Sequence, residues 1–197
     1  AMSKLEYAKS LSAALAYLML HQQDAVGVLT FADHPRQYVP PRATRSHLDI
    51  LLKTLAAGGP EGRTRLGPAL HELAERIKRR GLVLLCSDLM DKPEEVLSAL
   101  NHFRHRQHEV VVFHILDPDE ADFPYTDTAT FVDMESGERL TTEPWEIARR
   151  YRERLEAWRE HYRRHCRERM IDYVPLDTRM PFDRALLAYL EKRARLM

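Results

Sequence analysis

The sequence predicts an α/β fold, a doubly wound and mainly parallel sheet with helices on both faces. Three continuous apolar runs lead to this expectation, at residues 25–32, 82–87 and 109–116. Strands that are covered on both faces of a parallel sheet show such runs. Segments with helical periodicity lie between them, as right-handed crossovers require. We therefore expect a single three-layer domain over residues 1–197.

The first element is expected to be a helix over residues 3–22, where apolar side chains recur at three- and four-residue steps without glycine or proline. The run at 25–32 follows as a buried strand. RQYV, residues 36–39, is bracketed by prolines and is typical of a short edge strand. Residues 46–55 again have helical spacing.

Two more helices are expected around the second buried strand. One covers residues 66–80 and ends at Gly81, because glycine favours the position after a helix. The other begins at Pro93 and runs to about residue 105. Both would pack on the sheet as crossovers.

The pattern changes in the last third of the chain, where residues 126–170 are expected to form a hairpin and a long helix appended to the domain. The hairpin alternates apolar and polar residues and turns at Ser136–Gly137. The expected elements are a hairpin over 128–142, a helix over 145–170, a strand over 171–178 and a helix over 181–195.

Composition narrows the class of protein. The formal net charge is zero and charged residues make up 30%, so nothing in the overall balance demands nucleic acid or a membrane surface. Two cysteines, Cys86 and Cys166, cannot form a disulfide framework. No apolar stretch approaches the roughly 20 residues of a membrane span, and no signal peptide is evident. We expect a cytoplasmic protein.

Polar residues gather where the expected strands end, and ligands of open α/β sheets bind at that edge. A loop with three glycines, residues 58–64 (GGPEGRT), would bring Thr64 to the same place. Carboxylates and hydroxyls suit a hard cation such as Mg²⁺ or Mn²⁺. The alternative is that these acids cap the following helices. The residues concerned are Asp33, Thr64, Ser87, Asp88, Asp91, Asp117, Asp119 and Glu120.

Six segments in order resemble the DUF58 proteins, which are similar to von Willebrand factor A domains, and the resemblance covers nearly the whole chain. It is carried by KLEYAKSLSAALAYL, DAVGVLTFAD, GRTRLGPAL, GLVLLCSDLMD, HEVVVFHILDPDEADFP and FVDMESGERL. The resemblance implies a metal-ion-dependent adhesion site (MIDAS) made of a DxSxS motif, a loop threonine and a later aspartate. Thr64 and Asp88 match the last two, with Asp33 and Asp117 as flanking candidates.

The chain departs from the family pattern in one respect, because it contains no DxSxS. In the pattern, that motif and the central strand carrying it lie immediately before Ser3. We therefore expect Mg²⁺ or Mn²⁺ in the full-length protein and none bound by this chain. The strands at 26–31 and 82–87 would flank the missing strand, so we expect them to pair with each other or with a second copy in a homodimer.

Function is expected to be protein–protein interaction without catalysis, and the resemblance implies work with a MoxR-type AAA+ ATPase in chaperone or assembly processes. The alternative is a Mg²⁺-dependent hydrolase of phosphate esters that uses Asp88, Asp117 and Asp119. The remaining histidines and arginines are expected to have structural roles. The pair His161 and His165 and the arginines near it favour a solvated helix face, and the histidines at a helix end favour the helix dipole over zinc; these are His102, His105 and His108.

Overall fold

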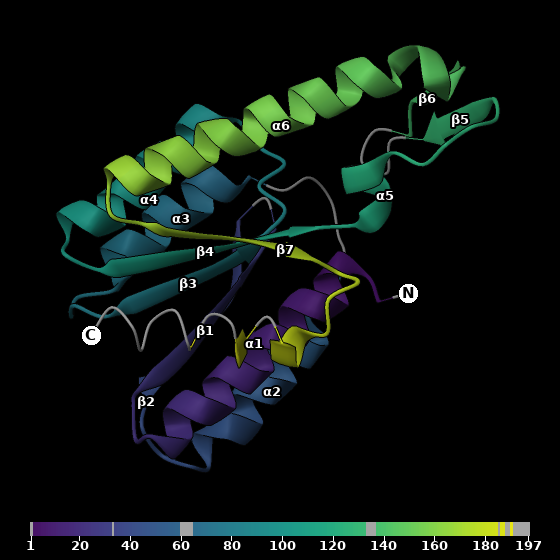
Figure 1. Ribbon diagram of the computed structural model, residues 1–197. Helices are drawn as coiled ribbons and strands as arrows, with labels where there is room; N and C mark the ends of the chain where they lie inside the picture. Colours follow the sequence, from purple (N-terminus) through teal and green to yellow (C-terminus); the bar gives the residue numbers. More distant parts are fainter. Residues whose placement is uncertain are drawn as a thin grey trace.

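The structure is a computed structural model that describes residues 2–32, 34–59, 65–132, 137–184, 186–187 and 190. Helices and strands alternate along most of it, and Figure 1 shows the helices lying above and below the strands. No helix in the described part is long and apolar enough to cross a membrane. The predicted mixed α/β fold is confirmed.

The N-terminal third forms a small antiparallel unit. Helix α1 (Lys4–His21) begins at Ser3, whose hydroxyl accepts the Glu6 backbone N–H in a capping box. Strand β1 (Val26–Phe31) then pairs antiparallel with β2 (Pro35–Arg42), and α2 (His47–Ala57) follows. The predicted edge strand is present, and it extends over the prolines on both sides of RQYV.

A parallel sheet forms the centre of the fold, with strand order β3-β4-β7. Side chains from both faces of β4 are buried, and Val112 and Phe113 are fully covered. One face packs on α3, α4 and α6, and the other packs on α1 and residues near Leu186. The elements are α3 (Leu66–Arg76), β3 (Leu82–Ser87), α4 (Pro93–His105), β4 (Glu109–Leu116) and β7 (Asp172–Asp177).

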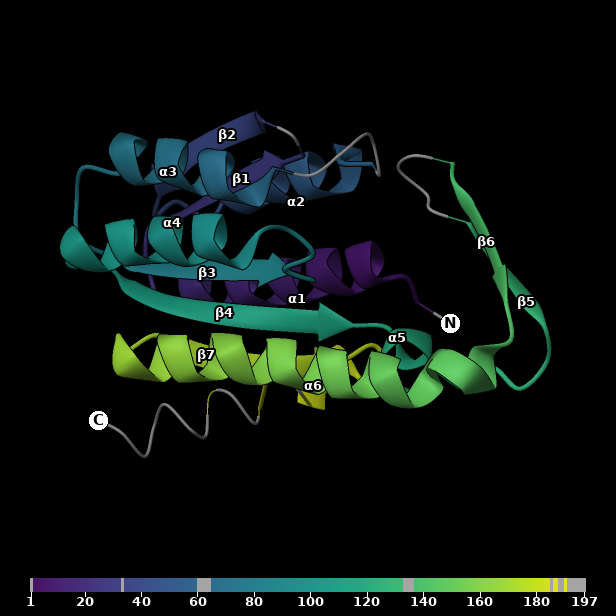
Figure 2. The same ribbon diagram turned by 90° about the horizontal axis from the view of Figure 1, so that it is seen from above.

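The remaining elements extend from one end of the sheet. Helix α5 (Pro118–Asp122) leads to the hairpin of β5 (Ala129–Val132) and β6 (Arg139–Thr142), and then to the long helix α6 (Pro144–Glu168). Figure 2 shows the hairpin and the start of α6 projecting beyond the sheet. The other end of α6 is part of the core, where Tyr162 and Cys166 are fully buried. Only half of the predicted appendage is therefore peripheral.

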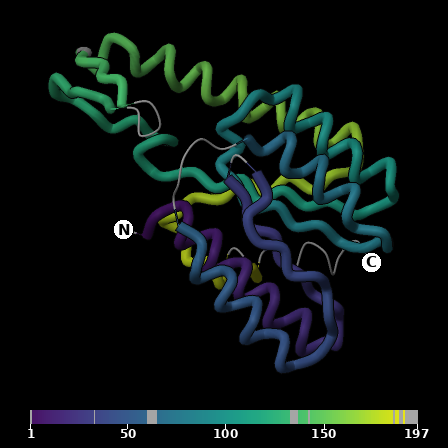
Figure 3. Tube along the Cα trace, turned by 180° about the vertical axis from the view of Figure 1, so that it is seen from behind, coloured from purple at the N-terminus to yellow at the C-terminus, as the bar shows by residue number. Residues whose placement is uncertain are grey.

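The prediction of one doubly wound sheet is wrong in one respect, because the strands form separate sheets. β1 pairs only with β2, and β3 pairs only with β4, among the residues that the structure describes. Direct pairing of β1 with β3 is therefore not found, and pairing through a second copy stays a prediction. Figure 3 shows the β1–β2 pair beside α1 and α2, as a separate pair of strands from the parallel sheet.

Three boundaries also differ from expectation. Helix α3 ends at Arg76, since Ile77 is already extended, so Gly81 does not cap it. Strand β1 is half-buried along its whole length and not covered on both faces. The last predicted helix is described in part, with residues 182–184, 186–187 and 190 helical. The rest of it lies outside the described residues, as does the predicted turn residue Ser136.

Candidate functional site

One lysine joins two carboxylates at the carboxyl end of the parallel sheet. The Lys4 ammonium donates to Asp88 Oδ2 at 2.9 Å and to Glu120 Oε1 at 2.5 Å. All three side chains are about one-third exposed, at 28%, 36% and 30% for Lys4, Asp88 and Glu120. We call these three residues the edge cluster. It lies within reach of a partner molecule.

Asp88 is positioned by the turn that follows β3. Its Oδ1 accepts the backbone N–H of Met90 at 3.2 Å, and Ser87 Oγ accepts that of Leu89 at 3.0 Å. Leu89 takes a left-handed conformation with φ 56°, and its side chain is fully buried. Burial of this leucine anchors the turn, so the strained backbone holds the Asp88 carboxylate at the sheet edge.

Glu120 is positioned by a helix cap. Its Oε2 accepts the backbone N–H of Asp117 at 3.0 Å, while Asp117 Oδ1 accepts that of Asp119 at 3.0 Å. Tyr151 of α6 donates its hydroxyl to the Glu120 carbonyl at 2.9 Å. Asp117 therefore caps α5, which is the alternative role considered for the strand-end acids.

Electrostatics favour the charged form of the lysine. Burial lowers the pKa of Lys4, but the attraction and hydrogen bonds of Asp88 and Glu120 outweigh burial and raise that pKa above its ordinary value. The ammonium therefore stays protonated at neutral pH. It gives the two carboxylates a tethered cation.

The predicted site residues have different outcomes. Asp88 lies in the edge cluster, and Asp117 contacts it through Glu120. Thr64 and Asp33 lie outside the described residues, so their predicted positions stay predictions. Asp91 holds the start of α3 instead, since its Oδ2 accepts the Leu66 backbone N–H at 2.7 Å.

Lys4 was not predicted as a site residue. It lies 84 residues from Asp88 and 116 from Glu120, and no local pattern links it to either. Only the fold, which begins α1 at the sheet edge where β3 and β4 end, brings them together. A lysine ahead of an apolar helix was the sole available signal.

A hard divalent cation does not fit the edge cluster as it is arranged. One oxygen of each carboxylate is bonded to Lys4, and the other accepts a backbone N–H. The described part of the chain contains no group of three or more His, Cys, Asp or Glu side chains that could hold a metal ion. The described residues thus give Mg²⁺ too few free oxygens.

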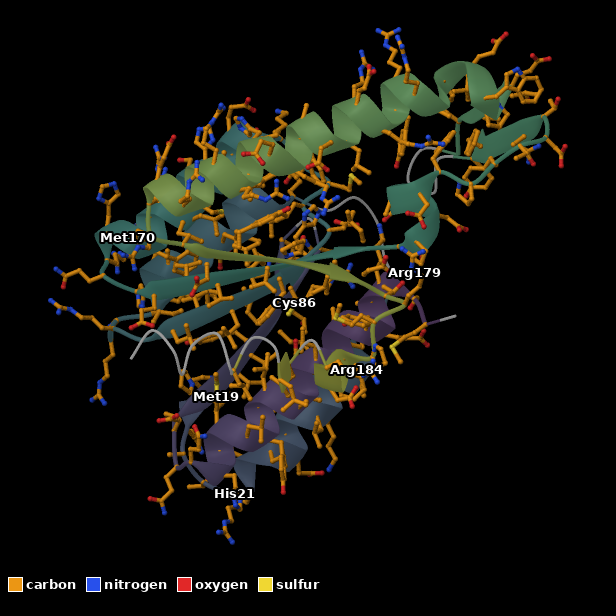
Figure 4. The ribbon with its side chains drawn as sticks, in the orientation of Figure 1. Met19, His21, Cys86, Met170, Arg179 and Arg184 are labelled. Atoms are coloured by element: carbon orange, nitrogen blue, oxygen red, sulfur yellow. The ribbon has the colours of Figure 1, made fainter. Side chains whose placement is uncertain are left out.

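Arg179 forms ion pairs near the carboxyl end of the parallel sheet. Arg179 donates to Asp122 Oδ2 at 2.6 Å and also to Asp177, which ties the end of β7 to α5 (Figure 4). Burial raises the pKa of Asp177, but the hydrogen bonds and charge of Arg179 outweigh burial, so the pKa of Asp177 is lowered overall.

Desolvation raises the pKa of the Cys86 thiol to about 11, so this cysteine is not a nucleophile at neutral pH.

A buried histidine lies behind the cluster on β4. His114 is fully covered, bonds the Tyr173 hydroxyl through Nδ1, and meets the Trp158 ring edge-on at 4.9 Å between centroids. Burial lowers its pKa to about 4, with Arg159 adding to the effect. The ring is neutral at physiological pH, and it belongs to the packing between α6 and the sheet.

Known proteins resemble this chain in sequence and in structure. The profile of the family described as "Protein of unknown function DUF58" matches residues 1–165. Uncharacterized proteins Mb1516 of Mycobacterium bovis and Rv1480 of Mycobacterium tuberculosis are each 29% identical over 137 residues. That alignment covers 68% of this chain and 43% of either relative, so the chain spans less than half of their length.

Two solved structures share the fold. An aerotolerance-related membrane protein from Bacteroides fragilis has a TM-score of 0.57 and 20% identity, over 88% of this chain and 81% of that one. The conserved hypothetical protein BatB from Bacteroides thetaiotaomicron has a TM-score of 0.57 and 17% identity, over 96% and 87%. Identities this low show similarity of fold alone.

Proposed function

The chain belongs to the DUF58 family, and from that premise we propose that it is a non-enzymatic protein–protein interaction domain of the metal-ion-dependent adhesion type. The observation that carries the proposal is the edge cluster. Two carboxylates meet one cation at the carboxyl end of a parallel sheet, where ligands of such folds bind. The von Willebrand factor A-like assignment of the fold is part of this proposal.

The exposure of the cluster supports recognition of a partner. Asp88 and Glu120 keep about one-third of their side-chain surface open, so a partner can reach both carboxylates without unfolding of the edge. The capping bonds of α5 and the turn after β3 fix these carboxylates in advance. Pre-organised groups lose little conformational entropy on binding, which favours affinity.

As part of this proposal, Mg²⁺ or Mn²⁺ would bind with Thr64 and Asp88 as two of its ligand positions. Lys4 holds Asp88 in the structure, so such a cation would have to displace the ammonium. It would then supply open coordination positions for a carboxylate of the partner. The role of Asp88, to present a carboxylate at the edge, is the same with either cation.

The partner in this proposal is a MoxR-type AAA+ ATPase, and the process is chaperone or assembly work in the cytoplasm, where such an ATPase finds its nucleotide. Neither nucleic acid nor a membrane is the ligand. Some arginines of α6 support this choice, because glutamates pair with them along the helix: Arg149 with Glu153, Arg159 with Glu156, and Arg163 with Glu160. Pairing reduces the charge that these three arginines can offer to phosphates.

The test is binding of a purified MoxR-type ATPase to this chain and to two matched aspartate variants. Asp88→Ala removes the edge carboxylate. Asp49→Ala removes an exposed carboxylate on α2 that pairs with Lys53 at 2.7 Å and is not part of the edge cluster. We expect Asp88→Ala to weaken binding about tenfold or more, a loss of about 1.4 kcal/mol, and Asp49→Ala to leave it unchanged. Equal binding by all three proteins would overturn the proposal.

A further inference from the structure

A cluster of two histidines and a glutamate lies between α3 and α4, which cover one face of the parallel sheet. These helices lie side by side in Figures 1 and 2. Gly67 permits their close approach, since a Cβ there would lie 2.8 Å from Glu95 Cβ. One turn further along α3, His71 Nδ1 lies 3.1 Å from His102 Nδ1 of α4.

The neighbours of His102 determine which of its nitrogens carries a lone pair. Its Nε2 lies 3.0 Å from Glu75 Oε1, and Glu75 Oε2 accepts from Arg106 at 2.7 Å. A carboxylate only accepts hydrogen bonds, so this contact favours a proton on Nε2 of His102. In that neutral tautomer the other nitrogen, Nδ1, carries the lone pair and faces His71.

We propose that His71 and His102 bind a divalent transition-metal ion such as Zn²⁺ through their two Nδ1 atoms. Imidazole nitrogens lie about 2.0–2.1 Å from zinc, so an Nδ1–Nδ1 separation of 3.1 Å corresponds to an N–Zn–N angle of roughly 100°. That angle lies between the octahedral and tetrahedral values. To bind one ion, both rings must turn so that their Nδ1 lone pairs point at the ion and not at each other.

The surroundings of the pair resemble those of metal-binding histidines elsewhere. Such histidines donate their second N–H to a carboxylate, which fixes the tautomer and the ring orientation. Glu75 is placed to accept in this way, since its Oε1 lies 3.0 Å from His102 Nε2, and Arg106 in turn holds Glu75. Glu75 is thus a positioning residue, and the two histidines are the ligands.

Solvent supplies the remaining coordination positions. A shallow surface hollow of about 270 Å³ opens beside His71, lined by Gly67, Pro68, Glu94, Glu95 and Ser98. The His102 side chain is 26% exposed, so an ion reaches the pair directly from water. Two protein ligands with open positions define a site that exchanges its metal readily, unlike a closed structural zinc site.

Metal binding must displace the proton that lies between the two Nδ1 atoms. Without metal, the two Nδ1 atoms share one proton, which His71 donates to His102. The ion takes the place of that proton, which moves to His71 Nε2 or to solvent, and both imidazoles bind in the neutral form.

The chain contains a second histidine pair that serves as a control. His161 and His165 stand one turn apart on α6, with ring centroids 4.3 Å apart. His165 Nδ1 is already bonded to the His161 carbonyl at 2.9 Å, and no carboxylate of the described residues contacts either ring. We expect this pair to contribute little, and the double variant H161A/H165A tests that directly.

The experiment titrates Zn²⁺ alone into the metal-free chain by isothermal calorimetry. The proteins are the unaltered chain, His71→Ala, His102→Ala, Glu75→Gln and the α6 double variant. We expect one equivalent bound by the unaltered chain and by the α6 variant. Loss of either α3–α4 histidine should weaken binding more than about tenfold, and Glu75→Gln should weaken it about 10–100-fold. Co²⁺ absorption would report the imidazole ligands independently.

Each outcome decides the assignment. Binding that survives His71→Ala or His102→Ala, or that disappears in the α6 variant, would place the metal elsewhere. No heat with the unaltered chain would also overturn the proposal. Thermal unfolding of the metal-free proteins separates effects on folding from effects on binding. A variant that has only lost a metal ligand should have the same melting temperature as the unaltered chain. His71→Gln and His102→Gln replace any variant that does not fold.

Discussion

The parallel sheet and the antiparallel β1–β2 pair are stabilised in different ways, although their strands β4 and β1 are similarly apolar in sequence. The central strand of the parallel sheet, β4, is covered on both faces, and seven of its eight residues are buried. Every residue of β1 in the antiparallel pair is only half-buried. β2 contributes three prolines, and the pairing contains two register irregularities. An apolar run thus predicts a strand but not how many layers cover it.

The largest expected difference comes from truncating one side chain in each sheet. Phe113 of β4 is fully buried, so Phe113→Ala should lower the free energy of unfolding by about 3–5 kcal/mol. Val28 of β1 is half-buried, so Val28→Ala should cost only about 1 kcal/mol. Urea denaturation monitored by circular dichroism measures both. Similar losses would mean that the two sheets contribute equally to the core.

Acid should weaken the parallel sheet in particular. The pKa of His114 in the fold is about 4 against 6.5 ordinarily, because burial and then Arg159 disfavour the charged ring, while Asp88 opposes them and Lys4 adds slightly. Between pH 6.5 and about 4, the unfolded chain binds a proton here that the folded chain does not. The free energy of unfolding should therefore fall as pH falls, by about 3 kcal/mol in all.

Urea denaturation at about pH 7 and about pH 5 tests this linkage. His114→Gln should flatten the pH dependence in that window, while the partly exposed His161→Gln should leave it intact. His108, whose pKa burial also lowers, accounts for a remaining slope. An unaltered slope in His114→Gln would remove His114 as the cause.

A glycine offers a way to disturb the antiparallel pair alone. A Cβ on Gly27 of β1 would lie 2.6 Å from the Val39 carbonyl and 2.9 Å from Pro41 N. Gly27→Ala should therefore force β1 and β2 apart at a cost of about 1–3 kcal/mol. Gly81→Ala is the matched control, since nothing lies within 4 Å of its Cβ position, and it should change stability by less than about 0.5 kcal/mol.

Hydrogen exchange would localise the effect of Gly27→Ala. Faster exchange confined to β1 and β2 is expected, with β4 unchanged. Equal acceleration in β4 would show that the β1–β2 pair and the parallel sheet unfold as one unit.

The smallest effect should come from the edge cluster. Lys4→Gln removes one cation from two partly exposed carboxylates, and such pairs contribute below about 1 kcal/mol. The loss should shrink at high salt, because salt screens the charges. The control is Lys53→Gln, which breaks an exposed pair on α2 and should change stability even less. A loss that does not depend on salt would contradict an electrostatic role.

The sequence predicted most elements because local signals determine them. The apolar runs gave β3 and β4 with their observed limits, and the strand at 171–178 is present as β7. The separation of the sheets could not be predicted, because it depends on what covers and neighbours each strand and not on composition. The early end of α3 was missed since Ile77, an apolar residue in register, leaves the helix.

The sequence predicted only those site residues that directly follow a strand. Asp88 and Asp117 follow β3 and β4 directly, so the rule for parallel sheets located them. Lys4 and the pair of His71 and His102 depend on contacts between distant segments, 84 and 31 residues apart. No periodicity along the chain contains such information, because helix crossing and side-chain direction create these contacts.

Helix α1 belongs to both sheets. Its first half, through Tyr7, Leu11 and Leu15, packs on the parallel strands, and its second half, through Ala16 and Leu20, packs on α2 and the β1–β2 pair. Two cooperative units therefore share one helix. When the β1–β2 pair and α2 unfold locally, the last two turns of α1 must either unfold or move with them, while the first turns stay packed on the parallel sheet. Native-state exchange along this single helix should then divide near residues 15 and 16, into amides that follow one sheet and amides that follow the other.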